Sequence, residues 1–200
     1  MIPRALLLTV GALLLCTPAA AAQEEAPAEA SADELGRAVR EVERLDELRS
    51  SLAETFRQGG AEADRETFRN VCRPVGVRAK EIAAENGWTV AQMAIRYRNP
   101  SHEADSVARD VMRAMERDPS LMGTWREARM DGREGVRYFR RIVVEPACLA
   151  CHGAKEERPA FVKDDYPDDR AFGFEVGDLR GVYSVFLPAV PAGNDGEGSR

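Results

Sequence analysis

The sequence predicts a single α+β domain in which helices come first and a mostly antiparallel sheet follows. Two observations favour this class. Residues 31–60 repeat apolar side chains every three or four positions, which is typical of an amphipathic helix. From residue 86 onward, short runs rich in β-branched and aromatic residues are separated by turn residues. Helices followed by strands, without a regular alternation of the two, indicate an α+β arrangement.

Two long helices are expected at the start of the domain. The first begins at Ser31, which can form a capping box with Glu34, and ends at residues 59–60. The second covers about 63–85. Pro74 falls inside this second helix and should kink or interrupt it, because proline lacks a backbone donor.

The rest of the domain is predicted to supply strands, with one helix inserted. A strand is expected over 88–100, followed by a helix over 101–120 that Ser101 caps. The inner face of that helix should carry Val107, Val111, Met112 and Met115. A hairpin over 123–146 should turn at Asp131-Gly132 or Glu134-Gly135. A loop or single turn over 147–153 and a last strand over 181–190 complete the expected elements.

Residues 1–22 have the layout of a secretory signal peptide. Arg4 precedes an apolar stretch, residues 5–16, and a run of alanines ends at Ala22. The apolar stretch is shorter than the roughly 20 residues of a membrane span. We therefore expect cleavage near Ala22 and a periplasmic protein with no stable membrane span; the alternative is an uncleaved N-terminal anchor. The remaining chain should comprise a flexible leader (23–30), the folded domain (31–189) and a disordered tail (190–200).

Charge and cysteine content restrict the partners and the chemistry. The formal net charge is −6, and it becomes −7 once residues 1–22 are removed. An acidic chain repels polyanions, which argues against nucleic acid as a partner. Three cysteines remain after cleavage, and an odd number in an oxidising compartment calls for a role beyond one internal disulfide.

The sequence ACLACHG at 147–153 contains the pattern C-x-x-C-H, formed by Cys148, Cys151 and His152. This pattern is the attachment signal for c-type haem. The two thiols can reach two vinyl groups on one porphyrin edge, and the imidazole can then bind the iron. One such pattern predicts one covalently attached haem c. The alternatives are a disulfide and a zinc site, although zinc needs four ligands and only Cys72 and His102 remain as further donors.

The residues alone leave the second axial ligand open. Cys72 is the odd cysteine, and a thiolate ligand would account for it, but a small core cysteine is an equally good interpretation. The other candidates are His102 and the methionines Met93, Met112, Met115, Met122 and Met130.

Four segments together resemble a family of exported mono-haem domains with a PAS-like fold, found alone or as the sensor part of bacterial signalling proteins. These segments are NVCRPVG (70–76), NGWTVAQMAIRYRNP (86–100), RRIVVEPACLACHG (140–153) and YPDDRAFGFEVGDLRGVYSV (166–185). The resemblance implies an antiparallel sheet flanked by helices, with the haem held against it. It also implies axial ligation by His152 and Cys72. Members usually carry Asn and a Pro-Asp pair where this chain has 101–105, so His102 is either a rival ligand or a surface substitution.

Haem propionates need cationic or hydrogen-bonding partners. The residues expected to supply them are Arg96, Arg98, Asn99 and Arg141, with Arg140 and Arg180 as further options. Trp88, Tyr97 and Phe139 are candidates to line the pocket, although core packing alone would explain them.

The predicted function is that of a periplasmic mono-haem protein that senses redox state or a diatomic gas. A thiolate ligand favours ferric iron and hence a low potential. Release of Cys72 on reduction would open a coordination position and act as the switch. Sensing would require a periplasmic redox or signalling partner protein. The alternatives are a simple periplasmic electron carrier and a haem enzyme of sulfur or peroxide chemistry.

Overall fold

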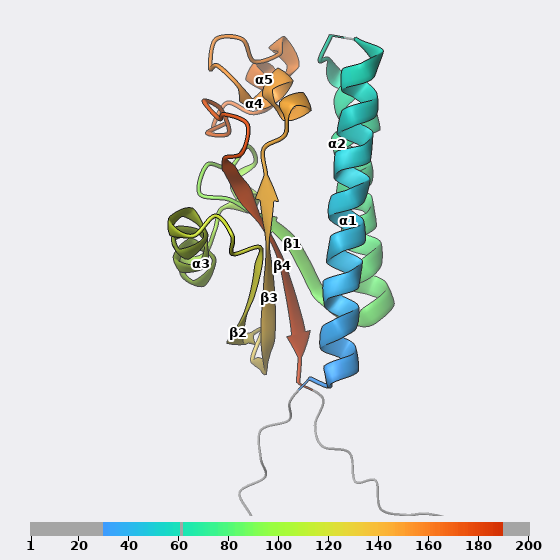
Figure 1. Cartoon of the computed structure of the whole chain (residues 1–200), viewed down its shortest axis with the longest axis vertical. Helices are drawn as coiled ribbons and strands as arrows, with labels where there is room; N and C mark the ends of the chain where they lie inside the picture. Colours follow the sequence, from blue (N-terminus) through green and yellow to red (C-terminus); the bar gives the residue numbers. More distant parts are fainter. Residues whose placement is uncertain (1–29, 61, 190–200) are drawn as a thin grey trace, which may run out of the picture.

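The computed structural model describes residues 30–60 and 62–189 (Figure 1). The predicted signal peptide (1–22), the leader up to residue 29 and the tail (190–200) lie outside the described residues. In the part of the chain that is described, no helix combines the length and the apolar character that crossing a membrane requires.

A four-stranded antiparallel sheet occupies the centre of the domain, with the strand order β1-β4-β3-β2. The strands are β1 (Thr89–Met93), β2 (Gly123–Met130), β3 (Arg133–Val143) and β4 (Leu179–Pro188). A hairpin of two long helices, α1 (Ala32–Gly59) and α2 (Arg65–Asn86), covers one face of the sheet, and α3 (Ser106–Arg117) lies on the other (Figure 1). This confirms the α+β class and the long N-terminal helix, and it is consistent with a PAS-like fold.

The alternation of side chains along β3 produces two separate cores. Tyr138 packs into the cluster formed with α1 and α2, whereas the next residue, Phe139, packs against α3. Successive side chains of a strand point to opposite faces, so one strand serves both layers. The short elements η2 (Pro146–Cys148), α4 (Leu149–His152) and α5 (Ala160–Asp165) gather beyond one end of the sheet (Figure 1).

The helical hairpin follows the prediction with two differences. Ser31 Oγ accepts a hydrogen bond from Glu34 N at 3.2 Å, as expected of the cap. The Glu34 carboxylate, however, accepts a hydrogen bond from Trp88 Nε1 at 3.0 Å, so it holds the start of the sheet segment. Helix α2 also continues through Pro74 without interruption. Its buried residues begin at Val75, and packing in this half sustains the helix beyond the proline.

The strand expected over 88–100 is wrong in its second half, because β1 ends at Met93. The chain then turns back on itself: Ala94 N donates to His102 O at 2.9 Å, and Ala104 N donates to Ala94 O at 3.1 Å. Residues 95–103 therefore form a loop that includes the 3₁₀ turn η1 (Pro100–His102).

The inserted helix consequently starts later than expected. Its cap is Asp105, which accepts from Ala108 N at 2.8 Å, and not Ser101, which lies in η1. Ala108 takes the buried position that was expected for Val107, whose side chain is exposed. The predicted hairpin turn at Asp131-Gly132 is confirmed, since both residues have the positive φ values (52° and 76°) that such tight turns require.

Candidate functional site

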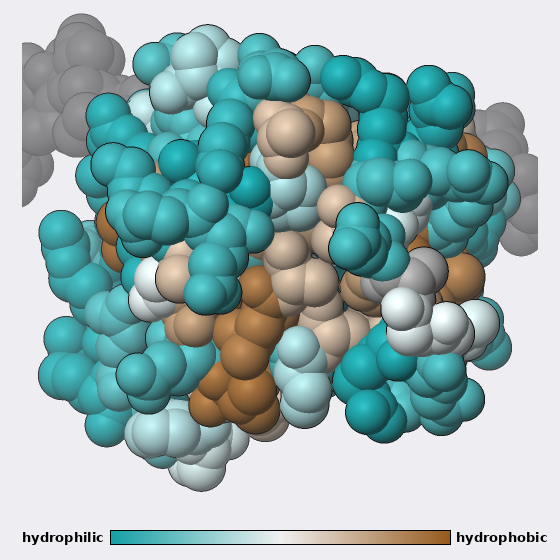
Figure 2. All heavy atoms as spheres, turned by 90° about the horizontal axis from the view of Figure 1, so that it is seen from above, coloured by the Kyte–Doolittle hydropathy of each residue, from teal (hydrophilic) through white to brown (hydrophobic). Residues whose placement is uncertain are grey.

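A cavity of about 540 Å³ lies between α2, the loop after β1 and the segment that contains α4. Its volume is within the range of roughly 300–1,000 Å³ that is typical of small-molecule and cofactor sites. Figure 2 looks onto the end of the molecule that carries α4 and α5, where a strip of apolar side chains lies between hydrophilic rims. An apolar pocket with a few polar groups is the usual form of a cofactor site.

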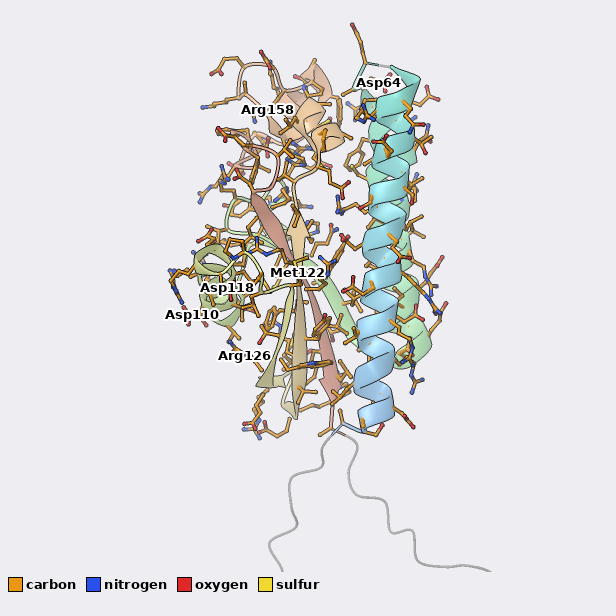
Figure 3. The ribbon with its side chains drawn as sticks, viewed as in Figure 1. Asp64, Asp110, Asp118, Met122, Arg126 and Arg158 are labelled. Carbon is orange, nitrogen blue, oxygen red and sulfur yellow. The ribbon has the colours of Figure 1, made fainter. Side chains whose placement is uncertain are left out.

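The fold brings most of the predicted site residues to this cavity. Six of them line it: Cys72, Arg98, Asn99, Cys148, Cys151 and His152. Tyr97 and two of the rival ligands, Met93 and His102, line it as well. The expected pocket residues Trp88 and Phe139 belong to the two cores instead, as do Met112 and Met115. Figure 3 shows Met122 beside the sheet, away from the end of the molecule where Arg158 lies.

Two short turns hold the C-x-x-C-H residues. Pro146 begins η2, and α4 follows directly, so Cys148 and Cys151 belong to consecutive turns. Gly153 then ends α4 by donating its N–H to Leu149 O at 2.9 Å. A Cβ atom at residue 153 would lie only 2.7 Å from that same oxygen. The close approach explains why glycine follows the histidine.

The imidazole of His152 is fixed through one nitrogen. Nδ1 lies 2.7 Å from the carbonyl oxygen of Ala171, which can only accept, and 3.2 Å from Nη2 of Arg98, which can only donate. The shorter contact favours the tautomer in which Nδ1 carries the proton. The ring also stands edge-on to Phe174, with centroids 6.1 Å apart. Burial and the nearby cations Arg180 and Arg98 hold the pKa of His152 well below its usual value. The imidazole is therefore neutral, and its Nε2 is an unprotonated donor that can bind a metal.

The acceptor of this hydrogen bond is itself positioned by Asp169. The buried Asp169 carboxylate accepts from Ala171 N at 2.9 Å. It also pairs with Arg158 at 2.7 Å and with Arg98 at 3.4 Å. Arg98 in turn donates to Cys151 O at 2.6 Å. Asp169 thus links Ala171, which accepts the hydrogen bond from His152, to Arg98, which binds the backbone oxygen of Cys151. The sequence reasoning missed this role, although Asp169 lies inside the YPDDRAF segment.

The thiols have different surroundings. Cys72, Cys148 and Cys151 are all unpaired within the described ranges. Cys148 Sγ accepts from Glu145 N at 3.4 Å, and Glu145 pairs with Arg49 of α1 at 3.1 Å. Neither Arg49 nor Glu145 was expected at the site, because charged residues on helices and beside loops are usually surface.

Cys72 faces the pair from the opposite helix. It belongs to α2 and its exposed side chain lines the cavity. Although solvent reaches Cys72 through the cavity, the surrounding protein atoms desolvate the thiol and raise its pKa to about 11, and the nearby Cys151 adds to this effect. The thiol is therefore protonated at neutral pH unless a cation, such as a metal ion, replaces the proton.

Two of the arginines expected to bind a cofactor do not line the cavity. Arg96 stacks over Phe174 at 3.5 Å, and its Nη1 donates to Gly173 O at 3.2 Å. Arg141 points to the α3 face of the sheet, where it binds the carbonyl oxygens of Met115 and Leu121. Residues 139 and 141 of a strand share a face, so Arg141 follows Phe139 to that side. Neither side chain is therefore among those that the structure places around the cavity.

Arg140 and Arg180 have contrasting positions. Arg140 pairs with Glu43 of α1 at 2.9 Å and is therefore part of the packing between helix and sheet. Arg180 lines the cavity.

Comparison with known proteins places this site in a family. A family model described as Tll0287-like matches residues 23–188. The chain belongs to the Tll0287-like family. A solved structure, the crystal structure of the cyanobacterial heme-protein Tll0287, is 46% identical in sequence, with a TM-score of 0.70. The similarity covers 80% of this chain and 98% of that chain.

A comparison with curated proteins finds no match. The Tll0287-like family is thus assigned on both sequence and fold, since the family model and the solved structure agree.

Proposed function

We propose that this Tll0287-like chain is a mono-haem protein with one haem c attached through Cys148 and Cys151. The observation that carries the proposal is the convergence of both thiols and the neutral His152 on one cavity. The 46% identity to a protein described as a heme-protein supports the haem. The C-x-x-C-H sequence supports its covalent attachment.

The chemistry of the cavity fits a haem. Apolar side chains such as Val71, Val75 and Ile142 suit the porphyrin faces. The fixed tautomer of His152 leaves Nε2 to bind iron, and the hydrogen bond at Nδ1 is the kind of support that orients metal-binding histidines. Buried cationic side chains suit the propionates. The donor set therefore agrees with an iron porphyrin better than with zinc.

We further propose His152 and Cys72 as the two axial ligands. They come from different elements, α4 and α2, and they line the same cavity. Because the pKa of the free Cys72 thiol is high, binding of ferric iron by Cys72 would displace the thiol proton, and reduced iron would bind the thiolate less strongly. A bound haem supplies one-electron redox chemistry, and thiolate ligation favours its ferric state.

The role that these residues support best is sensing of redox state or a diatomic gas in the periplasm. Cys72 would be held in the ferric protein and released on reduction, which exchanges an internal ligand for an open position. A partner protein would then bind differently to the forms with Cys72 bound and released. An electron carrier is the second candidate, and it would keep Cys72 bound in both oxidation states.

The attachment is tested by expressing the chain in a host that matures c-type haem. We expect a Soret band that remains with the polypeptide after denaturation and acid extraction. The mature mass should equal residues 23–200 plus one haem. Cys148→Ser and Cys151→Ser should each lose covalent attachment at one position, whereas Cys72→Ser, the matched control, should keep both. Complete extraction of haem from the wild type would overturn the proposal.

A further inference from the structure

We propose that Arg180 is the residue that binds a haem propionate and sets the charge around the iron. This inference rests on the haem site proposed above. Arg180 lies at the start of β4 and lines the cavity. Its Nη1 donates to the backbone oxygen of Arg96 at 3.0 Å. Within the described ranges, no carboxylate lies within ion-pairing distance of its guanidinium.

Arg73 and Lys80 of α2 also line the cavity but are exposed to solvent, and the two remaining arginines near the motif are already engaged. Arg98 pairs with Asp169 and donates to Cys151 O. Arg49 pairs with Asp46 at 2.8 Å and with Glu145 at 3.1 Å. A guanidinium presents five donors and is usually matched to an anion when it is removed from water. Arg180 is therefore the arginine near the motif whose charge has no carboxylate partner among the described residues, and a bound anion would supply one.

The charge balance of the surrounding cluster points the same way. Four arginines are linked by contacts here: Arg96, Arg98, Arg158 and Arg180. They are opposed by two carboxylates, those of Asp169 and Asp178. Two positive charges remain, and a haem brings two propionates. A dianionic cofactor would thus balance the cluster.

Arg180 lines the same cavity as His152 and Cys72, the two proposed ligands, so its charge faces the site of the iron. Burial lowers the pKa of Arg180 itself to about 10, with Arg98 adding to the effect, so the guanidinium remains charged at neutral pH. A cation near the iron disfavours the ferric state, which carries one more positive charge. Arg180 should therefore raise the midpoint potential.

The test is a potentiometric titration of the haem-loaded protein at pH 7. Arg180→Gln should lower the midpoint so that the ferric-to-ferrous ratio at a fixed potential rises about tenfold, which is about 59 mV for one electron. Arg96→Gln, the matched control, removes an equal charge from a residue that does not line the cavity. It should shift the midpoint by much less. Equal shifts in the two variants would overturn the inference.

Arg180→Lys keeps the charge without the planar fork, and it serves if the glutamine variant does not load haem. We expect its midpoint to stay near that of the wild type while the propionate bending bands in its resonance Raman spectrum shift. Unchanged bands would also overturn the inference. A wild-type protein that carries no covalent haem would instead refute the proposed function, so the two failures are distinguishable.

Discussion

His152 donates its Nδ1 proton to the carbonyl oxygen of Ala171 across 2.7 Å. This contact decides which nitrogen of the imidazole is available to a metal. The acceptor, Ala171, lies in a loop 19 residues further along the chain. The buried carboxylate of Asp169 positions this loop by accepting a hydrogen bond from Ala171 N. The ligand and its support thus come from different segments, joined by one acidic side chain.

Replacement of Asp169 should be costly. Asp169→Asn removes the charge between Arg98 and Arg158 and leaves two largely buried guanidinium groups unbalanced. Breaking a buried pair in this way typically costs about 3–5 kcal/mol. Urea denaturation should show a loss of about 3 kcal/mol in the free energy of unfolding.

Asp178→Asn is the matched control for this prediction. Asp178 is 41% exposed and lies 3.8 Å from Arg96, so its removal should cost less than about 1 kcal/mol. A similar loss in the two variants would show that Asp169 does not organise the site.

A change of the axial histidine should move the potential. His152→Met replaces the imidazole by a thioether, which favours ferrous iron, so we expect the midpoint to rise. Axial ligands span roughly 0.8 V in haem proteins, and the rise should be a clear fraction of that range. Redox titration followed at the Soret band measures it. An unchanged potential would mean that His152 does not bind the iron.

The pairing of β1 with β4 beside the cavity depends on a glycine. A Cβ atom on Gly181 would lie 2.5 Å from Met93 O, a backbone atom that cannot move without disturbing the strand pair. Gly181→Ala should therefore destabilise the domain by roughly 1–3 kcal/mol, the usual cost of overpacking. Thermal unfolding measures this loss.

Gly59 provides the comparison for that substitution. A Cβ atom there meets nothing within 4 Å, and the residue is helical. Gly59→Ala should be neutral or stabilising by up to about 1 kcal/mol. A larger loss in Gly59→Ala than in Gly181→Ala would contradict the steric explanation.

Aromatic contacts connect the part of α2 that carries Cys72 to α5 and to Tyr166, the residue that follows α5. The ring of Phe68 lies 6.1 Å from that of Phe161 and 6.4 Å from that of Tyr166. Each such pair is worth about 0.5–1.5 kcal/mol. Phe68→Ala should therefore favour release of Cys72 roughly tenfold, seen as faster binding of carbon monoxide by the reduced protein.

Arg65→Gln is the control for this helix contact. It removes an exposed ion pair to Asp165 on the same two elements, which should change the rate little. If Phe68→Ala binds carbon monoxide no faster than Arg65→Gln, the aromatic contacts do not restrain Cys72.

The sequence was sufficient for the elements whose pattern is local. The periodicity of α1 and the Asp131-Gly132 turn depend on neighbours in the chain, and both are confirmed. Position 93, where β1 ends, could not be found in this way. It depends on the hydrogen bonds between Ala94 and residues 102 and 104, which form only when the loop folds back.

The same distinction applies to the site. The C-x-x-C-H sequence is a local signal, and it marks one wall of the cavity. Asp169 and Arg49 support that wall from distant segments, so composition and spacing do not reveal them. Arg141 was assigned from its proximity in sequence, but the alternation of β3 directs its side chain to the other face.

The proposed exchange of Cys72 is tested most directly by optical spectra. Ferric and dithionite-reduced samples of the wild type and of Cys72→Ala would be recorded, with and without carbon monoxide. We expect a low-spin thiolate spectrum in the ferric wild type that is lost in the variant, and binding of carbon monoxide by both reduced proteins. Ferric spectra that coincide would contradict the account, because Cys72 would then be no ligand and the switch would not exist.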